Sequence, residues 1–202
     1  MRVLKDNKYN AILNASREEF IRKGYKEASM RDIAQNAGVG LSNIYNYFRN
    51  KDEIFLAITK PAKEDLFTFI TDQHTEEGFD FKQLSAFGHQ EGAVDQYISI
   101  ISRYKDEFHL LLYHAQGSSI GNFRDMLTDH ITQVSHDYMR LEKKYYPDAR
   151  QVSDFFIHAM ASWMVSVLGE MVTHRISRKK IRDFFQEYFR FSFAGWRELT
   201  GL

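Results

Sequence analysis

The chain has 202 residues, of which 44% are hydrophobic and 15% aromatic, with only 2 Pro and 11 Gly. This composition is too apolar for a disordered protein and sufficient for a sizeable core, and the scarcity of turn-forming residues favours long helices over an all-β fold. The absence of cysteine excludes a thiol nucleophile, a disulfide framework and a cysteine zinc site.

The net charge of zero hides an asymmetry between the two parts of the chain. Residues 1–52 contain ten Lys or Arg and six Asp or Glu, which leaves +4 there and −4 in the remainder. A basic first part is typical of a surface that faces a polyanion. We find no unbroken apolar run of 18 residues and no apolar segment of a secretory signal, and we therefore expect a cytoplasmic protein that does not enter a membrane.

The first predicted helix contains Tyr9, Leu13, Ser16 and Phe20, which recur at the spacing of one helical face, and Ile12 and Ala15 widen this apolar stripe. Gly24 follows two cations, and we expect the helix to end there, because glycine tolerates the left-handed conformation of a helix end.

The second predicted helix is short. The hydroxyl of Ser29 can cap its start, and Asp32 lies three residues later, as in a capping box. Met30, Ile33 and neighbouring alanines give it an apolar face, and Gly38 should end it after about two turns.

The third predicted helix begins after Gly40, with Ile44 and Phe48 facing inward. Two short helices that meet at a glycine-containing turn behind a longer helix are the helix-turn-helix arrangement. A merely solvated helix face usually carries Lys and Glu, whereas Asn, Ser and Tyr can pair with base edges and phosphates. The outer face of this helix is polar and nearly uncharged, with Leu41, Ser42, Asn43, Asn46 and Tyr47. This composition favours a DNA-binding face, and the alternative is a small helical subdomain with an ordinary polar surface.

A fourth helix should begin after Asn50, the expected N-cap, with Glu53 completing a capping box. Lys51 then occupies the first helical position, where the helix dipole disfavours a cation. A bound phosphate would reverse the sign of this interaction. Alternatively, Asp52 and Glu53 simply balance the lysine.

The stretch from about Ile12 to Leu56 resembles the DNA-binding domain of the TetR family of bacterial transcriptional regulators. The rest of the chain matches this family only in length and helical pattern. The matching residues are Ile12, Ala15, Phe20, Gly24, Tyr25, Arg31-Asp32-Ile33-Ala34, Ala37-Gly38-Val39, Ile44-Tyr45, Tyr47-Phe48 and Lys51-Asp52-Glu53-Ile54.

The resemblance implies a homodimer that binds a palindromic operator in double-stranded DNA, usually to repress, and leaves it when a small-molecule effector binds the C-terminal domain. Carried onto this chain, the base-reading residues are Arg31, Leu41, Ser42, Asn43 and Asn46, and the phosphate-contacting residues are Ser29, Tyr45, Tyr47 and Lys51. For Tyr45, the alternative to a phosphate contact is a core aromatic residue with its hydroxyl at the rim.

Two positions depart from the family pattern. Gly40 stands where Ser or Thr is common, which keeps an acceptable cap but removes a hydroxyl. Ser42 stands where Gly is frequent, so the backbone would approach DNA less closely there.

The predicted fold is all-α with about nine helices: a helix-turn-helix DNA-binding domain over residues 1–50 and a helical ligand-binding and dimerisation domain over residues 51–202. Pro61 lies inside the fourth helix and would either kink it or break it in two. Further helical patterns cover 81–87, 91–103, 105–115, 121–146, 150–174 and 178–197.

The last two helices are apolar on more than one side, and such helices must be covered on more than one side. A four-helix bundle formed with a second subunit would cover them, as the resemblance also implies, and a monomer covered by its own helices is the alternative. The expected dimer residues are Ala159, Ser162, Ser166, Gly169, Phe185, Phe189 and Trp196.

Aromatic and methionine side chains in the middle helices are candidates for an effector pocket, although such stripes also form ordinary cores. The candidates are Tyr97, Tyr104, Phe108, His109, Tyr113, Phe123, Trp163 and Met164.

We expect no metal, cofactor or enzymatic activity. His109 and His114 are five apart, a spacing that does not place two imidazoles on one α-helical face. No phosphate-binding, zinc-protease or nucleophile-elbow motif is present. Two functions remain: a ligand-switched DNA-binding repressor, or a helical adaptor that grips another protein.

Overall fold

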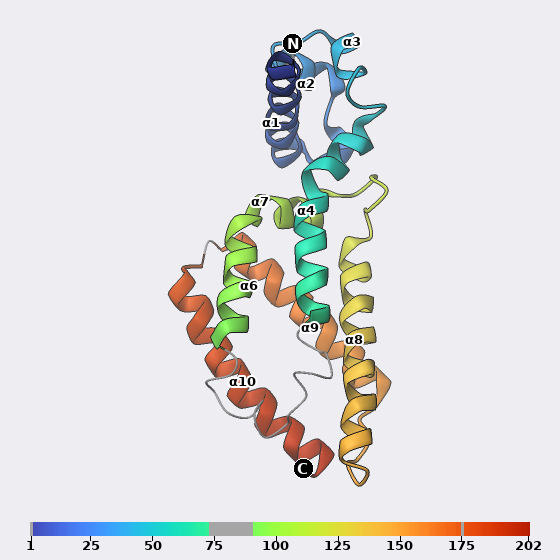
Figure 1. Ribbon diagram of the computed structural model, residues 1–202, viewed down its shortest axis with the longest axis vertical. Helices are drawn as coiled ribbons and strands as arrows, with labels where there is room; N and C mark the ends of the chain where they lie inside the picture. Colours follow the sequence, from blue (N-terminus) through green and yellow to red (C-terminus); the bar gives the residue numbers. More distant parts are fainter. Residues whose placement is uncertain (1, 73–90, 175) are drawn as a thin grey trace. The chain divides into compact units, whose positions relative to one another are not determined.

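The computed structural model describes residues 2–72, 91–174 and 176–202, and these residues contain helices and no strand (Figure 1). The all-α prediction is confirmed. The predicted helix over 81–87 lies outside the described residues. The helices are α1 (Arg2–Glu27), α2 (Met30–Asn36), α3 (Leu41–Ile44), α4 (Lys51–Asp72), α6 (Glu91–Arg103), α7 (Lys105–His109), the π-helix η3 (Leu110–His114), α8 (Phe123–Tyr145), α9 (Asp154–Thr173) and α10 (Arg178–Thr200).

Packing divides the chain into two compact units. Unit 1 consists of Met1–Glu64 and Tyr104–Arg124, and unit 2 of Asp65–Arg103 and Asp125–Leu202. The boundary after residue 50, which we predict between a DNA-binding domain and a ligand-binding domain, divides the chain by function and stays a prediction. By packing, the first half of α4 and the whole of α7 and η3 belong with the N-terminal helices.

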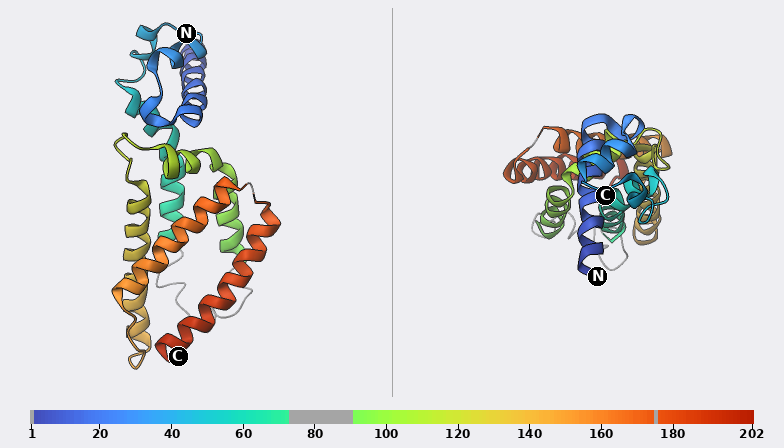
Figure 2. Two further views of the ribbon diagram at one scale, coloured as in Figure 1. Left: turned by 180° about the vertical axis from the view of Figure 1, so that it is seen from behind. Right: turned by 90° about the horizontal axis from the view of Figure 1, so that it is seen from above.

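One buried face of α1 organises unit 1. Ile12 and Phe20 are fully buried, and Ala15 and Ser16 are buried beside them, as the helical spacing predicts. Ile33 of α2, Ile44 of α3 and Ile54 of α4 are also fully buried. Figure 2 shows these helices gathered at the N-terminal end of the chain. Each helix therefore turns an apolar side inward and leaves its polar side at the surface.

Three aromatic rings join α1 to α4 inside this core. The ring of Phe55 lies 5.2 Å from that of Phe20 and 5.2 Å from that of Tyr25, edge-on to both. Edge-to-face pairs add about 0.5–1.5 kcal/mol beyond the area that they bury. The start of α4 is therefore fixed against the end of α1.

The backbone of α1 leaves the helical conformation at Gly24, with φ 76° and ψ 164°, a region that other residues rarely adopt. The predicted break is confirmed in position, but helical structure resumes and continues to Glu27. Tyr25 and the residues after it are thereby turned towards α4, which a straight helix would not do.

The fourth helix runs without a break from Lys51 to Asp72, with Pro61 inside it. A break at Pro61, one of the two predicted alternatives, is thus excluded. The third helix is shorter than expected, because only Leu41–Ile44 is α-helical and a turn follows. Phe48 nevertheless donates its N–H to the carbonyl of Ile44 at 3.0 Å, and both side chains are buried as predicted.

In unit 2, aromatic contacts join α6 to α10. Tyr97 is packed edge-on against Phe185 at 5.0 Å and lies 5.7 Å from Phe69 of α4. On α8, the ring of His130 stacks on Phe67 at 4.4 Å. Aromatic side chains thus bring α4, α6, α8 and α10 together in this unit.

Helix α9 has the length and composition of a membrane-spanning helix, with a mean hydropathy of 1.5 over 18 residues. The expectation that the protein does not enter a membrane stays a prediction. It considered only unbroken apolar runs, whereas the scattered Ser, Thr and His of α9 leave the mean hydropathy high. The core helix of a soluble protein passes the same test.

Phe55→Ala should lower the free energy of unfolding by about 3–5 kcal/mol, because it opens a cavity where two rings now pack. Lys60→Ala, an exposed change on the same helix, should change it by less than about 0.5 kcal/mol. Urea unfolding followed by circular dichroism measures both values. Equal effects would contradict a core centred on this ring.

Candidate nucleic-acid interface

Ser29 caps α2 as predicted. Its Oγ accepts hydrogen bonds from the N–H of Arg31 at 3.2 Å and of Asp32 at 3.5 Å. The carboxylate of Asp32 does not return to the cap, and instead accepts from Lys23 Nζ at 2.7 Å. Only half of a capping box is therefore formed, and the other half is replaced by an ion pair between α2 and α1.

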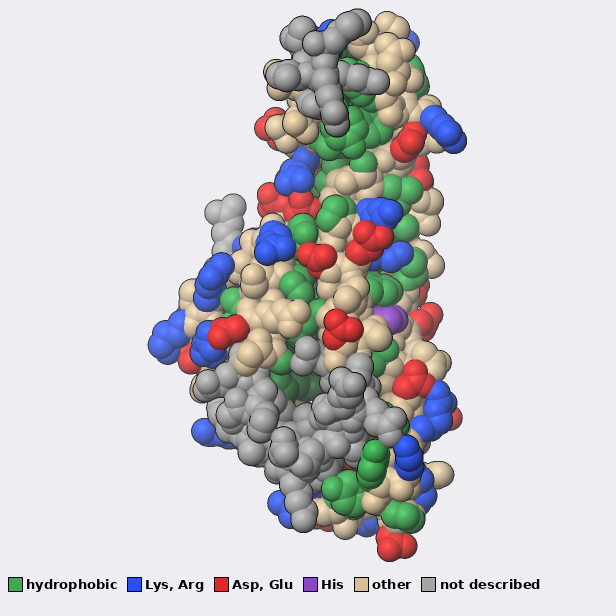
Figure 3. All heavy atoms as spheres, viewed as in Figure 1, with side chains coloured by type: hydrophobic (Ala, Val, Ile, Leu, Met, Phe, Trp, Pro, Cys, Tyr) green, Lys and Arg blue, Asp and Glu red, His purple; other side chains and the backbone are tan. Residues whose placement is uncertain are grey.

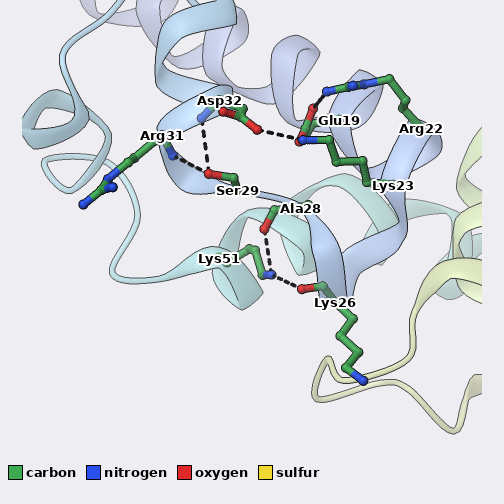
Figure 4. A network of polar contacts seen from close by, with 9 residues as sticks. All are labelled: Glu19, Arg22, Lys23, Lys26, Ala28, Ser29, Arg31, Asp32 and Lys51. Atoms are coloured by element: carbon green, nitrogen blue, oxygen red, sulfur yellow. Dashed lines mark hydrogen bonds and ion pairs between the residues drawn. The ribbon is translucent and has the colours of Figure 1, made fainter.

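That ion pair belongs to a network that is anchored on a buried carboxylate (Figure 4). Glu19 has no exposed side-chain surface, and it pairs with Lys23 Nζ at 2.8 Å and with the guanidinium of Arg22. Burial raises the pKa of Glu19, but the hydrogen bonds from Lys23 and Arg22 outweigh it and the pKa falls below its usual value. Lys23 thus links α1 to the first turn of α2 and fixes the direction of α2.

The residues predicted to read bases lie on α2, on α3 and in the turn that follows α3. Arg31 is exposed, and Figure 4 shows its guanidinium directed away from the network. Ser42 and Asn46 are exposed, and Leu41 and Asn43 are half-buried. The structure therefore brings the five side chains to two adjoining short helices and the turn after them in one unit, while Ile33 and Ile44 of the same helices are buried.

The two tyrosines predicted to contact phosphate have different surroundings. Tyr45 is 52% exposed, so the alternative in which it is a core aromatic residue is wrong. Tyr47 is half-buried, and its ring lies 6.2 Å from Tyr9, which itself stacks on Phe48. Packing thus holds the ring of Tyr47 from one side, whereas Tyr45 extends into solvent.

The ammonium group of Lys51 binds other groups of the protein. Its Nζ donates to the carbonyls of Ala28 at 2.9 Å and of Lys26 at 3.2 Å, and it lies 4.5 Å from the centre of the Tyr25 ring. Neither alternative weighed from the sequence, a bound phosphate or balance by Asp52 and Glu53, included these partners. A contact with the end of α1, 23 residues earlier, has no signature in the local sequence.

The first turn of α4 is capped largely as predicted. Asn50 Oδ1 accepts from the N–H of Glu53 at 2.8 Å. Glu53 Oε2 accepts from the N–H of Arg49 at 2.5 Å, one residue earlier than in a standard capping box. The Asp52 carboxylate accepts from the backbone of Ser119 at 2.8 Å. Two carboxylates therefore stand at this helix end.

Charges of both signs are mixed on the face of the molecule shown in Figure 3. No single-sign field dominates that face, in agreement with the net charge of zero. Attraction of a polyanion would therefore depend on the local placement of cations such as Arg31, and not on the charge of the whole protein.

The predicted effector residues are divided between the two units. Phe108, Phe123 and Tyr97 are buried, Tyr104, His109 and Met164 are half-buried, and Tyr113 and Trp163 are 46% and 39% exposed. Tyr104, Phe108, His109, Tyr113 and Phe123 lie in unit 1, and Tyr97, Trp163 and Met164 lie in unit 2.

His109 and His114 share one face, contrary to the expectation from their spacing. Their ring centres lie 4.9 Å apart, because Leu110–His114 is π-helical and a wider turn brings residues five apart nearly into line. Among the residues that the structure describes, no group of three or more His, Asp or Glu could hold a metal ion.

The predicted dimer residues divide into two groups. Ala159, Ser162 and Ser166 are exposed along one side of α9. Gly169 and Phe185 are buried within the protomer, so neither contributes to an outer surface. Phe189 and Trp196 are half-buried, and Trp196 Nε1 donates to the buried carboxylate of Glu142 at 2.7 Å. One face of the last helices was expected to enter the protomer's own core and the other to face a partner, and Phe185, which was assigned to the partner side, lies in the core.

Comparison with known proteins supports the assignment of the N-terminal helices. Residues 12–58 match the family described as bacterial regulatory proteins, tetR family. Residues 12–58 thus form a domain of the TetR-family type. Its helix-turn-helix consists of α2, α3 and the supporting α1, and the matched range ends inside α4.

Two curated relatives each match a third or less of the chain. The HTH-type transcriptional activator FasR of Mycolicibacterium smegmatis is 34% identical over 65 residues, which are 32% of this chain and 30% of that protein. The fatty acid metabolism regulator protein of Bacillus subtilis is 38% identical over 53 residues, 26% of this chain and 27% of that protein. The chain thus matches less than a third of the length of either relative.

The whole chain resembles solved structures of the TetR fold. A TetR-like transcriptional regulator from Rhodococcus sp. RHA1 superposes with a TM-score of 0.59 over 93% of this chain and 96% of that one, at 18% identity. This likeness shows the fold alone, including that of the C-terminal helices, which lie after the residues that the family matches.

The Lys23–Asp32 ion pair should make stability depend on pH. The hydrogen bond from Lys23 holds the pKa of Asp32 below its ordinary value of 3.8, so the pair stabilises the fold above that value. As the pH falls through the lowered pKa, Asp32 is protonated and this stabilisation is lost. Asp32→Asn should unfold at lower urea than the parent at pH 7, and the two midpoints should converge as the pH falls below 4. A constant difference from pH 7 to 3 would contradict this role.

Proposed function

We propose that the protein is a ligand-responsive transcriptional regulator, and not an enzyme, that binds a palindromic operator as a homodimer in the cytoplasm. The observation that carries the proposal is the polar surface formed by Arg31 of α2 and by the nearly uncharged outer face of α3 and the turn after it, above a core that fixes both helices. TetR-family membership of this same segment supports it.

The proposed division of labour follows from side-chain chemistry. Arg31 can donate two hydrogen bonds to guanine, and Asn43 and Asn46 can pair with adenine, with Leu41 and Ser42 completing the base-facing surface. Ser29, Tyr45 and Tyr47 would donate to phosphates and set the register of the helices without reading sequence. The Ser29 oxygen is an acceptor within its own cap, which leaves its O–H free to donate outward.

The proposed dimer uses the outer side of α9 with part of α10. Phe155 and Phe191 are 80% and 68% exposed, beside small exposed residues at 159, 162 and 166 of α9 and at 194 and 195 of α10. Large side chains next to small ones suit the interdigitated packing of a four-helix bundle. Only 39% of the most hydrophobic 18-residue stretch of α9 is buried within the protomer, and a second subunit would cover the apolar surface that remains. A two-fold dimer would present two recognition surfaces, which requires two related half-sites in the DNA.

A small-molecule effector is proposed to bind among the helices after residue 50 and release the protein from DNA. The B. subtilis relative is named for fatty acid metabolism, which makes acyl compounds the first class to screen. Repression remains the proposed mode, and the name of the M. smegmatis relative, an activator, makes the sign of regulation a separate measurement.

The decisive experiment is binding to the DNA upstream of the protein's own gene, measured over a salt series. A DNA-binding protein that neutralises several phosphates should lose affinity steeply between about 50 and 200 mM salt, because counterions are released. Retained binding to DNA with no salt dependence, or no binding at all, would favour the alternative of a helical adaptor for another protein.

Arg31→Ala should relax the preference at one or two base pairs by about 1–3 kcal/mol, because a bidentate contact to guanine is lost. Competition among operators with single base changes measures this. Arg178→Ala, on the exposed start of α10, should leave the preference unchanged. If both variants discriminate as well as the parent does, Arg31 does not read bases.

Ala159→Arg should convert the dimer to a monomer, because it places a charge in the middle of the proposed apolar interface. Sedimentation velocity measures the change, and unaltered helicity would show that the protomer still folds. Asn14→Arg puts the same group on an exposed part of α1 and should leave the dimer intact. A parent protein that sediments as a monomer would refute the interface.

A further inference from the structure

We infer that Lys51 is a positioning residue that holds the junction between α1 and α2 against the first turn of α4 and does not bind a DNA phosphate. This inference rests on the proposed function, because what Lys51 positions is the DNA-reading surface. It replaces the phosphate contact that the family resemblance implies for the same residue.

The ammonium group lies where the ends of two helices meet. Its Nζ donates to the carbonyl oxygens of Ala28 at 2.9 Å and Lys26 at 3.2 Å, and both carbonyls belong to the end of α1 and the residue after it (Figure 4). Carbonyls in the last turn of a helix lack partners within the helix and carry the negative end of its dipole. A cation that is disfavoured at the start of α4 is therefore favoured by the end of α1.

Little of this ammonium group remains for DNA. Two of its three N–H bonds point to carbonyls, and the group lies 4.5 Å from the centre of the buried Tyr25 ring, within the range of a cation–π contact. The carboxylates of Asp52 and Glu53 stand at the same helix end and would repel a phosphate there. In agreement with enclosure by protein, burial lowers the pKa of Lys51, and Glu27 only partly opposes this shift.

The contacts of Lys51 lead directly to the DNA-reading surface. Ala28 immediately precedes Ser29, the N-cap of α2, and Arg31 follows two residues later. The other side of this corner is held by Lys23, which binds Asp32. Fixing the Ala28 carbonyl therefore fixes the start of α2 and the base from which Arg31 extends.

A positioning role and a phosphate contact predict different salt dependences. If Lys51 positions α2, Lys51→Ala should weaken operator binding by about tenfold at every salt concentration and leave the slope of log K against log[salt] unchanged. If Lys51 neutralised one phosphate, the magnitude of the slope would fall by about 0.9. Lys60→Ala, which removes an exposed lysine from the same helix, is the matched control and should change neither quantity.

The free protein provides the second measurement. Without DNA, Lys51→Ala should lower the melting temperature by about 3–6 °C, because two hydrogen bonds to a charged group are lost. It should also speed amide hydrogen exchange at residues 25–32. A reduced salt slope with unchanged melting and exchange would overturn the inference. If the parent protein binds no DNA, the proposed function fails, and the melting and exchange data still decide whether Lys51 holds this junction.

Discussion

Burial of one face of α1 against the three helices that follow it is the constraint on which the proposed DNA-reading surface depends. Phe20, Tyr25 and Phe55 lock the end of α1 to α4, and Ile33 and Ile44 turn the short α2 and α3 inward. Helices of seven and four residues would not be stable alone, because helix initiation costs more than so few hydrogen bonds return. The core therefore determines which polar side chains of α2 and α3 face outward.

Charge at helix ends supplies the second layer of organisation. Lys23 bridges the buried Glu19 and Asp32 on one side of the α1–α2 junction, and Lys51 holds the carbonyls of Lys26 and Ala28 on the other. Breaking either link would leave groups unpaired within a partly buried corner, which costs more than the loss of an exposed ion pair. The junction is thus held by contacts that are distant in sequence.

The sequence predicted those features that depend on local periodicity and local capping. The buried face of α1, the caps at Ser29, Gly40 and Asn50, and the break at Gly24 all belong to this class. Features set by tertiary contact or by an unusual helix were missed. Phe185 was assigned to the dimer interface because the sequence does not show that Tyr97 of α6 packs against it inside the protomer. His109 and His114 lie on one face only because Leu110–His114 is π-helical.

The attachment of residues 104–124 to unit 1 limits how the DNA-binding helices can respond to the rest of the chain. Glu107 has a side chain only 5% exposed and pairs with Arg17 of α1 at 2.7 Å, while the Asp52 carboxylate accepts from Ser119. Burial raises the pKa of Glu107, and Arg17 opposes this shift, so separating the pair would strand a buried carboxylate. Residues 104–124 therefore move together with α1. Along the chain, this segment is continuous with α6 on one side and α8 on the other, so two covalent connections besides α4 leave unit 1 for unit 2.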